Sequence, residues 1–380
     1  MSKDNPKVAL VHDYLAQYGG AEKTLEAILE IFPQAPIFTG IYSPANMPEI
    51  IKNQKIVQSK NPLFRLFTKH LSFLMPLVFE GFNLEEYDIV ISDSASWAKG
   101  VLTKPEQLHI SYIHTPPRFL YGYSVESPAR YNWFYKPFIL LIDHFLRIWD
   151  YCAAQRPNFL IANSATTKAR IKKFYKRDSV IIHPPLGINP VTETKRSIKS
   201  KLVDHNPYFC CLGRLSAYKN FDLLIQAFNI LGWNLVVMGT GSDEKRLKKM
   251  AGKTVEFLGK VSEEEKYSVI SQSLGLINPV KDEDWGIVPL EAMSMGKPVL
   301  AHRSGGATEN IKEGVTGMFF DSLDPNSLAK SIEQFQKNID CGMYDPQKLI
   351  AYSKNFSKEK FQEEFLNFVK EKWEEHARIS

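Results

Sequence analysis

The chain has 380 residues, which at roughly 100–200 residues per domain suggests two domains. Hydrophobic residues make up 44%, enough for two buried cores, and the formal net charge of +5 suits an anionic small molecule or membrane surface but is too small to argue for nucleic acid. The four cysteines form neither a C-x-x-C pair nor a metal-binding spacing, which favours buried thiols in a reducing compartment.

The N-terminal half alternates short β-branched runs with helical periodicity, the pattern of a parallel α/β sheet. Its polar start, "MSKDNPK", is unlike a secretory signal peptide. The best candidate for a membrane span, residues 134–149, has a pure apolar run of five residues, against the ~20 that a spanning helix needs. We therefore expect a soluble or at most peripheral protein. Strands are predicted at residues 7–13, 36–42, 87–93, 108–114 and 159–164, and helices at 19–32 and after Ser164 as N-cap.

A second series of the same kind begins near residue 207, after a segment at 183–202 in which prolines and polar residues break the periodicity. Its order predicts a second doubly wound half, followed by an amphipathic helix at 359–377. Strands are predicted at 208–214, 234–241, 255–261, 274–280 and 297–303, and helices at 220–231, 242–251 and 262–273, the last with Ser262 as N-cap.

Two cations follow the first strand of the second series. Arg214 and Lys219 lie in "GRLSAYKN", between a predicted strand and a predicted helix. Open α/β sheets bind ligands at the carboxyl ends of their strands, so this pair is a candidate clamp for a pyrophosphate. Two solvated surface charges are the alternative interpretation.

Glycine pairs open two further turns. Gly239 and Gly241 lie in "VVMGTGSDEKRL", which lacks the third glycine of the dinucleotide-binding fingerprint. The turn "HDYLAQYGGAEK" lacks the fingerprint as well, which argues against a dehydrogenase. Gly19 and Gly20 nevertheless open a helix and allow a phosphate or sugar to approach the backbone closely.

His114 ends a predicted strand and enters the Pro-rich loop "TPPRFLYGY". Its position at a strand end makes it a candidate for ligand contact, with Arg118, Tyr121 and Tyr123 close in sequence. A lone histidine is more often structural than catalytic, and both interpretations stay open.

The segment "DEDWGIVPLEAM" carries Glu283 before a predicted helix and Glu291 within it. Free backbone N–H groups at the start of this helix would suit phosphates, while one carboxylate binds a sugar hydroxyl and the other a ribose diol. A capping acid plus an acid on the helix surface is the alternative.

Five segments decide between these interpretations: "GRLSAYKN", "MGTGSDEKRL", "FLGKVSEEE", "EDWGIVPLEAMSMGKPVLA" and "SGGATENIKEGVTGMFF". In order and spacing they resemble the retaining family-4 glycosyltransferases, and Glu283 and Glu291 match that family's E-x7-E motif. "VHDYLAQYGGAEKTLEAI", "YDIVISDSASWAKGV", "YIHTPPRFLYGY", "ANSATTKARI" and "IIHPPLGI" agree in the N-terminal half. Together they are similar to the bacterial mannosyltransferase-like branch that builds surface polysaccharides and lipopolysaccharide O-antigen. Trp285 stands where many members of the family have Phe.

The resemblance implies an α/β protein of the GT-B fold, in which two Rossmann-like doubly wound domains face each other across a cleft. It implies an acceptor-binding domain at 1–185, a nucleotide-sugar-binding domain at 186–355, and a C-terminal helix within 356–380 that packs back on the first domain.

The implied reaction is retaining transfer of a hexosyl group from a nucleotide-diphosphate sugar to a saccharide or lipid-linked saccharide in bacterial polysaccharide or O-antigen assembly. We expect a mannosyl group from GDP-mannose. A UDP- or dTDP-sugar-dependent transferase is the alternative, followed by a nucleotide-sugar epimerase and a non-catalytic sugar-nucleotide-binding protein. No cofactor and no metal are expected, since basic side chains would hold the diphosphate. The expected location is cytoplasmic, with contact at the inner face of the membrane left open.

The resemblance also implies roles for individual residues. In the family, cations hold the diphosphate, Glu283 positions the donor sugar, and the leaving phosphate helps to deprotonate the acceptor in a front-face substitution. The implied catalytic residues are His114, Arg214, Lys219 and Glu283. The implied donor-binding residues are Gly19, Gly20, Gly239, Gly241, Lys260, Val261, Gly286, Ile287, Val288 and Glu291. The implied acceptor-binding residues are Tyr14, Arg118 and Tyr121.

Two stretches are candidates for contact with an anionic membrane. Residues 60–82 mix large apolar side chains with cations, and residues 167–177 place Lys168, Lys172 and Lys176 at intervals of four. The alternatives are a core helix pair and a solvated helix face.

Overall fold

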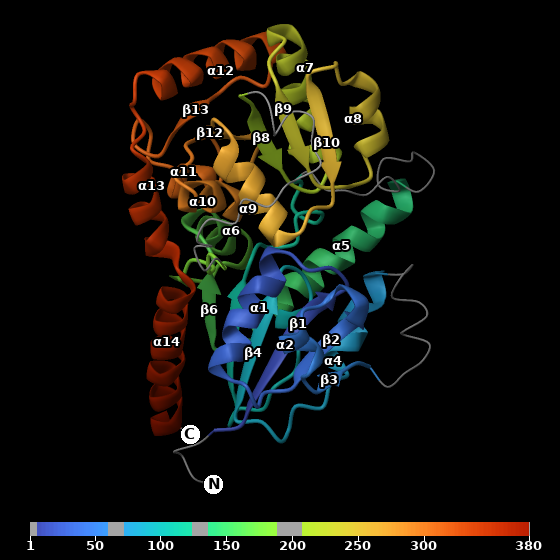
Figure 1. Ribbon diagram of the computed structural model, residues 1–380. Coiled ribbons are helices and arrows are strands. Elements are labelled where there is room, and N and C mark those ends of the chain that lie inside the picture. Colours follow the sequence, from blue (N-terminus) through green and yellow to red (C-terminus); the bar gives the residue numbers. More distant parts are fainter. Residues whose placement is uncertain (1–5, 60–71, 124–135, 188–206, 380) are drawn as a thin grey trace. The chain divides into compact units, whose positions relative to one another are not determined.

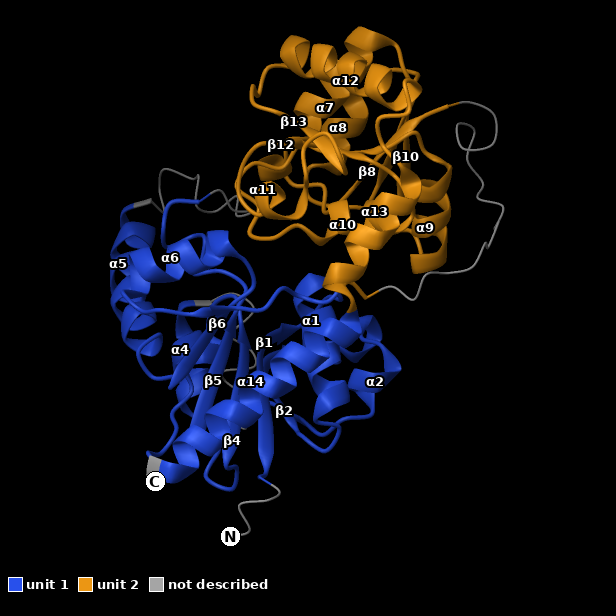
Figure 2. Cartoon of the chain, turned by 90° about the vertical axis from the view of Figure 1, so that its left-hand side faces the viewer, with its two compact units in different colours: residues 1–185, 358–380 blue, residues 186–357 orange. Residues whose placement is uncertain are grey.

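The computed structural model describes residues 6–59, 72–123, 136–187 and 207–379. The chain forms two compact units, shown in different colours in Figure 2. Unit 1 comprises residues 1–185 and 358–380, and unit 2 comprises residues 186–357. Each unit has its own sheet and its own core.

Unit 1 is built on a seven-stranded parallel sheet in the order β3-β2-β1-β4-β5-β6-β7. The chain runs outward from β1 to β3 and then returns to the other side of β1, so the topological switch point lies between β1 and β4 (Figure 1). All five strands predicted in this half are confirmed; β3 and β7, two residues each at the sheet edges, were not predicted. The strands are β1 (Val8–Leu15), β2 (Ile37–Tyr42), β3 (Ile56–Val57), β4 (Ile89–Ser94), β5 (Leu108–Ile113), β6 (Phe159–Ala162) and β7 (Val180–Ile181).

Alternate residues of the central strands enter two different cores, because successive side chains of a strand point to opposite faces. Leu10 and Ile91 pack with α1 and α14, whereas Val11 and Val90 pack with α4, η3 and α5. Ser164 caps α6 as predicted, its Oγ accepting from Thr167 N at 3.0 Å. The helices of unit 1 are α1 (Gly20–Ile31), η1 (Pro44–Asn46), α2 (Glu49–Lys52), η2 (Ser72–Leu74), α4 (Met75–Glu80), η3 (Ala98–Gly100), α5 (Lys136–Ala153), α6 (Ala165–Tyr175) and α14 (Lys358–Ile379).

The final helix, α14, belongs to unit 1 although it follows unit 2 in sequence. Phe361 and Phe365 place their rings against Tyr112 of β5, at centroid distances of 6.0 and 6.4 Å. Lys358 Nζ lies 2.9 Å from Glu30 Oε1 on α1. The prediction that the C-terminal helix returns to the first half is therefore confirmed.

Unit 2 has a six-stranded parallel sheet in the order β10-β9-β8-β11-β12-β13, with its switch point between β8 and β11. The predicted strands are confirmed, and β13 was not predicted. The strands are β8 (Phe209–Leu212), β9 (Leu235–Met238), β10 (Val255–Gly259), β11 (Leu276–Asn278), β12 (Val299–His302) and β13 (Gly317–Phe320).

The helices of unit 2 surround one hydrophobic core. Ser262 and Glu265 form a capping box at the start of α9, which confirms the predicted N-cap. The prediction left out α12, which begins with an Asp324 cap and Pro325 at its first position. The helices are η5 (Ala217–Lys219), α7 (Phe221–Leu231), α8 (Glu244–Met250), α9 (Glu263–Gln272), α10 (Ile287–Ser294), α11 (Ala307–Asn310), α12 (Pro325–Asp340), α13 (Pro346–Ser353) and η6 (Lys354–Phe356).

The two parallel sheets with their helices confirm the predicted fold class, an α/β protein with two doubly wound halves. Within the described residues, each helix is either too short or too polar to pass through a bilayer.

Candidate functional site

An ion pair lies at the switch point of the unit 2 sheet. Lys219 ends η5 after β8, Asn278 ends β11, and Glu283 follows β11. The carboxyl ends of these neighbouring parallel strands meet, so residues about sixty apart in sequence come into contact. Lys219 Nζ lies 2.8 Å from Glu283 Oε1, and Asn278 Nδ2 donates to Glu283 Oε2 at 3.1 Å. Both members of the ion pair are mostly buried, with 16% and 19% of their side chains exposed.

The charge of Lys219 is stabilised by its partner. Burial lowers the pKa of the ammonium, but the Glu283 carboxylate outweighs burial and holds the pKa of Lys219 above its ordinary value. Arg214 is exposed in the same loop and lowers the pKa of Lys219. The sequence-predicted cations thus influence each other electrostatically, and Lys219 is a cation throughout the neutral pH range.

Gly286 opens α10 next to Glu283. Its φ of 81° is in the left-handed region, and an added Cβ would lie 3.0 Å from Glu283 Oε2. Asn310 Nδ2 donates to the carbonyls of Trp285 and Gly286, at 2.8 Å each. These contacts hold the turn that leads into Ile287 and Val288, the first two residues of α10. The N–H groups of the first helical turn have no partner within the helix, which suits an anion.

The segment "SGGATEN" packs directly on the Glu283 loop. Gly306 N donates to Glu283 O at 2.8 Å, and a Cβ on Gly306 would lie 2.4 Å from Trp285 Cα. A Cβ on Gly305 would lie 2.2 Å from Glu283 O. Sequence reasoning quoted this segment but assigned it no role; its paired glycines were the signal for a close backbone contact.

Glu291 has a different cationic partner from Glu283. It is 3% exposed, and its Oε1 lies 2.8 Å from Lys266 Nζ of α9. Lys266 also lies 2.8 Å from Glu263 Oε2, so it contacts two carboxylates. Sequence reasoning missed Lys266, for which the spacing carries no signal. The two glutamates thus form ion pairs with different lysines.

Gly239 and Gly241 allow two loops at this sheet edge to interlock. A Cβ on Gly239 would lie 2.0 Å from Gly213 O, and one on Gly241 would lie 2.2 Å from Leu215 O. Packing of the loops after β8 and β9 therefore explains both glycines without a ligand. Lys260 and Val261 follow β10 at the same edge; Lys260 is exposed, and Val261 packs partly against the core.

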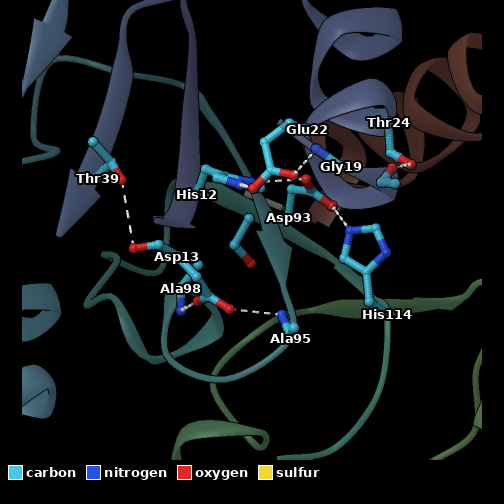
Figure 3. Close-up of polar contacts among 12 residues, drawn as sticks. His12, Asp13, Gly19, Glu22, Thr24, Thr39, Asp93, Ala95, Ala98 and His114 are labelled. Atoms are coloured by element: carbon cyan, nitrogen blue, oxygen red, sulfur yellow. Dashed lines mark hydrogen bonds and ion pairs between the residues drawn. The ribbon is translucent and has the colours of Figure 1, made fainter. Parts of the chain in front are cut away.

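A second polar cluster lies at the switch point of the unit 1 sheet (Figure 3). Asp93 of β4 contacts two histidines, His12 of β1 and His114 directly after β5. His12 Nδ1 lies 2.9 Å from Asp93 Oδ2, and His114 Nε2 lies 2.5 Å from Asp93 Oδ1. Glu22 of α1 approaches from the other side, its Oε1 3.6 Å from His12 Nε2. Sequence reasoning named only His114 of this cluster.

The carboxylates change the titration of both histidines. Burial lowers the pKa of His12, but Asp93 and Glu22 outweigh it and raise the pKa from 6.5 to about 10. Burial also lowers the pKa of His114 and Asp93 raises it, and the net effect is a raised pKa. Burial raises the pKa of Asp93, but His114 and His12 together lower it by more, so that the pKa falls from 3.8 to about 2. At neutral pH, Asp93 is therefore ionised and His12 is cationic. In the described residues, no group of three or more His, Cys, Asp or Glu side chains is arranged to hold a metal ion.

Asp13, next to His12, fixes the loop after β4. Its carboxylate accepts four backbone N–H groups, from Ala95, Ser96, Trp97 and Ala98, at 2.6–2.8 Å (Figure 3). Four such bonds satisfy the carboxylate fully, so Asp13 acts as a structural anchor.

Gly19 and Gly20 form the start of α1. Gly19 N donates to Glu22 Oε2 at 2.8 Å, so the glutamate that faces His12 also caps the helix (Figure 3). An added Cβ on Gly20 would meet no atom within 4 Å. Gly20 is therefore not required by local packing.

The three proposed acceptor residues make contacts away from His114. Tyr14 OH bonds Trp97 Nε1, and Tyr121 OH donates to Asp150 Oδ2 at 2.8 Å. The guanidinium of Arg118 lies over the ring of Tyr123 at 5.5 Å. Both tyrosine hydroxyls are thus engaged within unit 1.

Comparisons with known proteins show that the chain is similar to glycosyltransferases. Residues 192–356 match the family model for glycosyl transferases group 1. The human alpha-1,3/1,6-mannosyltransferase ALG2 is 28% identical over 283 residues, which cover 66% of this chain and 65% of the human protein, slightly under two thirds. A GDP-mannose-dependent monoacylated alpha-(1-6)-phosphatidylinositol monomannoside mannosyltransferase of Corynebacterium glutamicum is 28% identical over 190 residues, covering 44% of this chain and 50% of that protein.

Among solved structures, Anabaena Alr3699/HepE in complex with UDP and glucose is similar with a TM-score of 0.71. The match covers 96% of this chain and 100% of that chain, at 18% identity, and shows a shared two-unit fold. Unit 2 of the chain therefore contains a segment that matches the group 1 glycosyltransferases, and the chain has the α/β architecture of the GT-B fold.

Proposed function

We propose that the chain is a retaining glycosyltransferase of family 4 that moves a hexosyl group from a nucleotide-diphosphate sugar to a saccharide or lipid-linked saccharide. The observation that carries this proposal is the contact of Lys219 and Asn278 with Glu283, beside the glycine turn that opens α10. This cluster combines a cation, a carboxylate and a helix N-terminus at the switch point of a doubly wound sheet, inside the segment that matches the group 1 family.

In this proposal the donor's diphosphate contacts Arg214, Lys219 and the backbone of Gly286, Ile287 and Val288. Negative charge grows on the leaving phosphate during transfer, and fixed cations stabilise it without reorganising. The raised pKa of Lys219 supports this role, because the side chain carries its charge before the donor arrives. With cations in this role, we propose that transfer needs no metal; activity in excess EDTA would test it.

Glu283 would position the hydroxyls of the donor sugar, and Glu291 would bind the ribose diol. Lys219 and Asn278 orient the Glu283 carboxylate, which supports a positioning role. Lys266 holds Glu291 in place on α10. Lys260 and Val261 are the proposed contacts of the base, and Gly239 and Gly241 belong to the same loop edge.

Unit 1 would supply further contacts. We propose donor contacts from Gly19, Gly20 and His114, and the freedom around Gly20 supports close approach of a ligand. Tyr14, Arg118 and Tyr121 remain the proposed acceptor residues; the internal bonds of both tyrosines mean that they would have to contact acceptor through their rings.

Our proposed donor is GDP-mannose, which the names of two relatives support: both are mannosyltransferases, and one is named as GDP-mannose-dependent. The solved structure with UDP and glucose supports the alternative, a UDP-sugar donor. A dTDP-sugar donor, an epimerase and a non-catalytic binding protein are weaker alternatives. The proposed setting is bacterial polysaccharide or O-antigen assembly in the cytoplasm, with peripheral contact at the inner face of the membrane.

A thermal-shift panel of GDP, UDP, dTDP and ADP with their sugars tests the donor. A ligand that binds the folded state raises the melting temperature by mass action, so GDP-mannose should give the largest shift. A larger shift with a UDP-sugar would replace our donor. Proton NMR of the glycoside product tests retention: an anomeric centre inverted relative to the donor would contradict the proposed mechanism.

A further inference from the structure

Helix α5 exposes apolar side chains and buries its acids, the reverse of an ordinary surface helix. Phe138 and Phe145 are 69% and 63% exposed, whereas Asp143 and Asp150 are buried. The exposed apolar residues of α5 are Phe138, Leu140, Leu141, Phe145, Ile148 and Tyr151. We call these six residues the α5 stripe. Soluble proteins seldom expose so many large apolar side chains together, which points to a binding surface.

The inward-facing residues explain why α5 has this orientation. Asp150 Oδ1 lies 2.6 Å from Lys99 Nζ, and Tyr121 donates to the other oxygen of Asp150. Trp149 bonds Glu80 of α4 at 2.7 Å, and Leu146 is part of the core. A buried ion pair and a tryptophan thus fix which side of the helix faces solvent. The exposure of the α5 stripe therefore follows from the contacts that orient the helix.

Neighbouring elements extend the apolar surface. Leu77 of α4 and Leu102, shortly after η3, are about half exposed, and α4, η3 and α5 pack on the same face of the sheet. In both views α5 lies on the periphery of unit 1 (Figures 1 and 2).

A basic helix, α6, meets the C-terminal end of α5. Arg177, just after α6, donates to Ala154 O at 3.1 Å, and Gln155 donates to Tyr175 O at 3.0 Å, so the ends of α5 and α6 meet. Helix α6 contains no Asp or Glu and exposes Lys172 and Lys173. The exposed side of α5 likewise carries no carboxylate.

We propose that the α5 stripe inserts into the interface of an anionic lipid bilayer while the lysines of α6 contact its headgroups. The stripe spans fourteen residues, about 20 Å of helix, and combines aromatic and aliphatic side chains on a helix that meets the basic helix α6, as in helices that lie in a bilayer surface. Charge complementarity favours anionic lipid over a second copy of this basic surface. The inference deepens the proposed function, because it would bring the enzyme to a lipid-linked acceptor, but its test needs no glycosyl transfer.

Co-sedimentation of the full chain with vesicles tests the proposal. Vesicles of phosphatidylcholine and phosphatidylglycerol in a two-to-one ratio should bind the protein without nucleotide sugar, and high salt should weaken binding. Leu141→Ser together with Phe145→Ser should reduce the partition coefficient roughly tenfold or more, since two inserted side chains are lost. Lys172→Glu with Lys173→Glu should reduce binding to the anionic vesicles. Ile230→Ser is the matched control, because Ile230 is an equally exposed apolar residue of unit 2.

Several outcomes would overturn the proposal. One is absence of wild-type binding to the anionic vesicles; another is equal binding of the Leu141/Phe145 double variant. A dimer in light scattering that the double variant dissociates, with no vesicle binding by the wild type, would assign the stripe to a second copy. The same variants assayed on a water-soluble acceptor separate the two proposals: vesicle binding without any transfer by the wild type would reject the proposed function alone.

Discussion

Single carboxylates hold both polar clusters together. Asp93 bonds His12 of β1 and His114 just after β5, and Glu283 bonds Lys219 after β8 and Asn278 at the end of β11. Asp93 is buried, so its charge depends on these partners. Removing one partner therefore changes the pKa values and the orientation of the others.

The pKa of His12 predicts a pH dependence of stability in unit 1. Its pKa is about 10 in the folded chain and 6.5 when unperturbed, so the folded state binds the proton more tightly. The stabilisation is fully present below pH 6.5 and is lost as pH rises towards 10. The groups that face His12 are Asp93, Glu22 and, through Asp93, His114. We expect the free energy of unfolding of unit 1 to fall by a few kcal/mol more in the wild type than in His12→Gln across this window.

Urea denaturation at several pH values, read by hydrogen exchange of peptides from β1 and β4, measures this difference. His144→Gln is the control, because His144 is exposed on α5. Parallel pH profiles for the wild type and His12→Gln would contradict the charged state of His12.

Replacing Glu283 tests the unit 2 cluster. Glu283→Gln keeps the shape but removes the charge next to Lys219, so the sugar would be held less well in the transition state. We expect kcat to fall roughly a hundredfold or more while nucleotide binding persists. Glu313→Gln, a change of an exposed carboxylate in the same unit, should leave turnover unchanged. Steady-state kinetics with isothermal titration of the nucleotide separates the two effects, and full turnover by Glu283→Gln would reject the assigned role.

At the scale of elements, loops at the carboxyl edge of the unit 2 sheet are locked by backbone contacts. Gly239, Gly241, Gly305 and Gly306 each lie where a Cβ would collide with the backbone of another loop. The start of α10 is held differently, by the two bonds from Asn310 of α11. The position of the Gly286 turn thus depends on a side chain from a separate helix.

We expect Asn310→Ala to loosen this turn. Loss of two hydrogen bonds to buried carbonyls should cost about 1–3 kcal/mol of stability and weaken donor binding several-fold. Asn229 is the control, since its side chain also makes two backbone hydrogen bonds, Nδ2 donating to Met250 O and Oδ1 accepting from Gly252 N, at the exposed end of α7. Asn229→Ala should lower the melting temperature without changing the dissociation constant of the nucleotide-sugar donor, measured by isothermal titration. An unchanged dissociation constant for Asn310→Ala would show that donor binding does not depend on the position of this turn.

At the scale of the whole molecule, unit 1 is built from two segments that are separated in sequence, whereas unit 2 is one continuous segment. Phe365 of α14 is fully buried in unit 1, although unit 2 precedes it in the chain. Phe335 of α12 is fully buried in the core of unit 2. Unit 1 therefore cannot complete its core until the last helix has been synthesised.

Phe365→Ala should destabilise unit 1 by about 3–5 kcal/mol, the usual cost of emptying a large core site. Hydrogen exchange should quicken in β4 and β5 and remain nearly unchanged in β8 and β11. Phe335→Ala should produce the opposite pattern. Equal acceleration in both sheets after either change would mean that the units unfold together.

Most of the fold was predictable because its signals are local. The central strands are continuous β-branched runs, and Ser164 and Ser262 mark helix starts through bonds to residues three positions on. The edge strands β3 and β7 have two residues each, too few for a periodic pattern. The inward position of Asp143 and Asp150 on α5 was equally hidden, since the partner of Asp150 is fifty-one residues away, at Lys99.

For the candidate sites, sequence alone determined which residue types follow which strands: Lys219 after β8, Glu283 after β11 and His114 after β5. The tertiary structure decided their partners. Asp93 meets His12 across eighty-one residues, and Lys219 meets Glu283 across sixty-four. The physical reason is the order of the strands, which makes neighbours of β1 and β4 and of β8 and β11. Sequence periodicity specifies that a strand is buried, but only packing of the whole sheet specifies which strand ends, and therefore which charges, lie side by side.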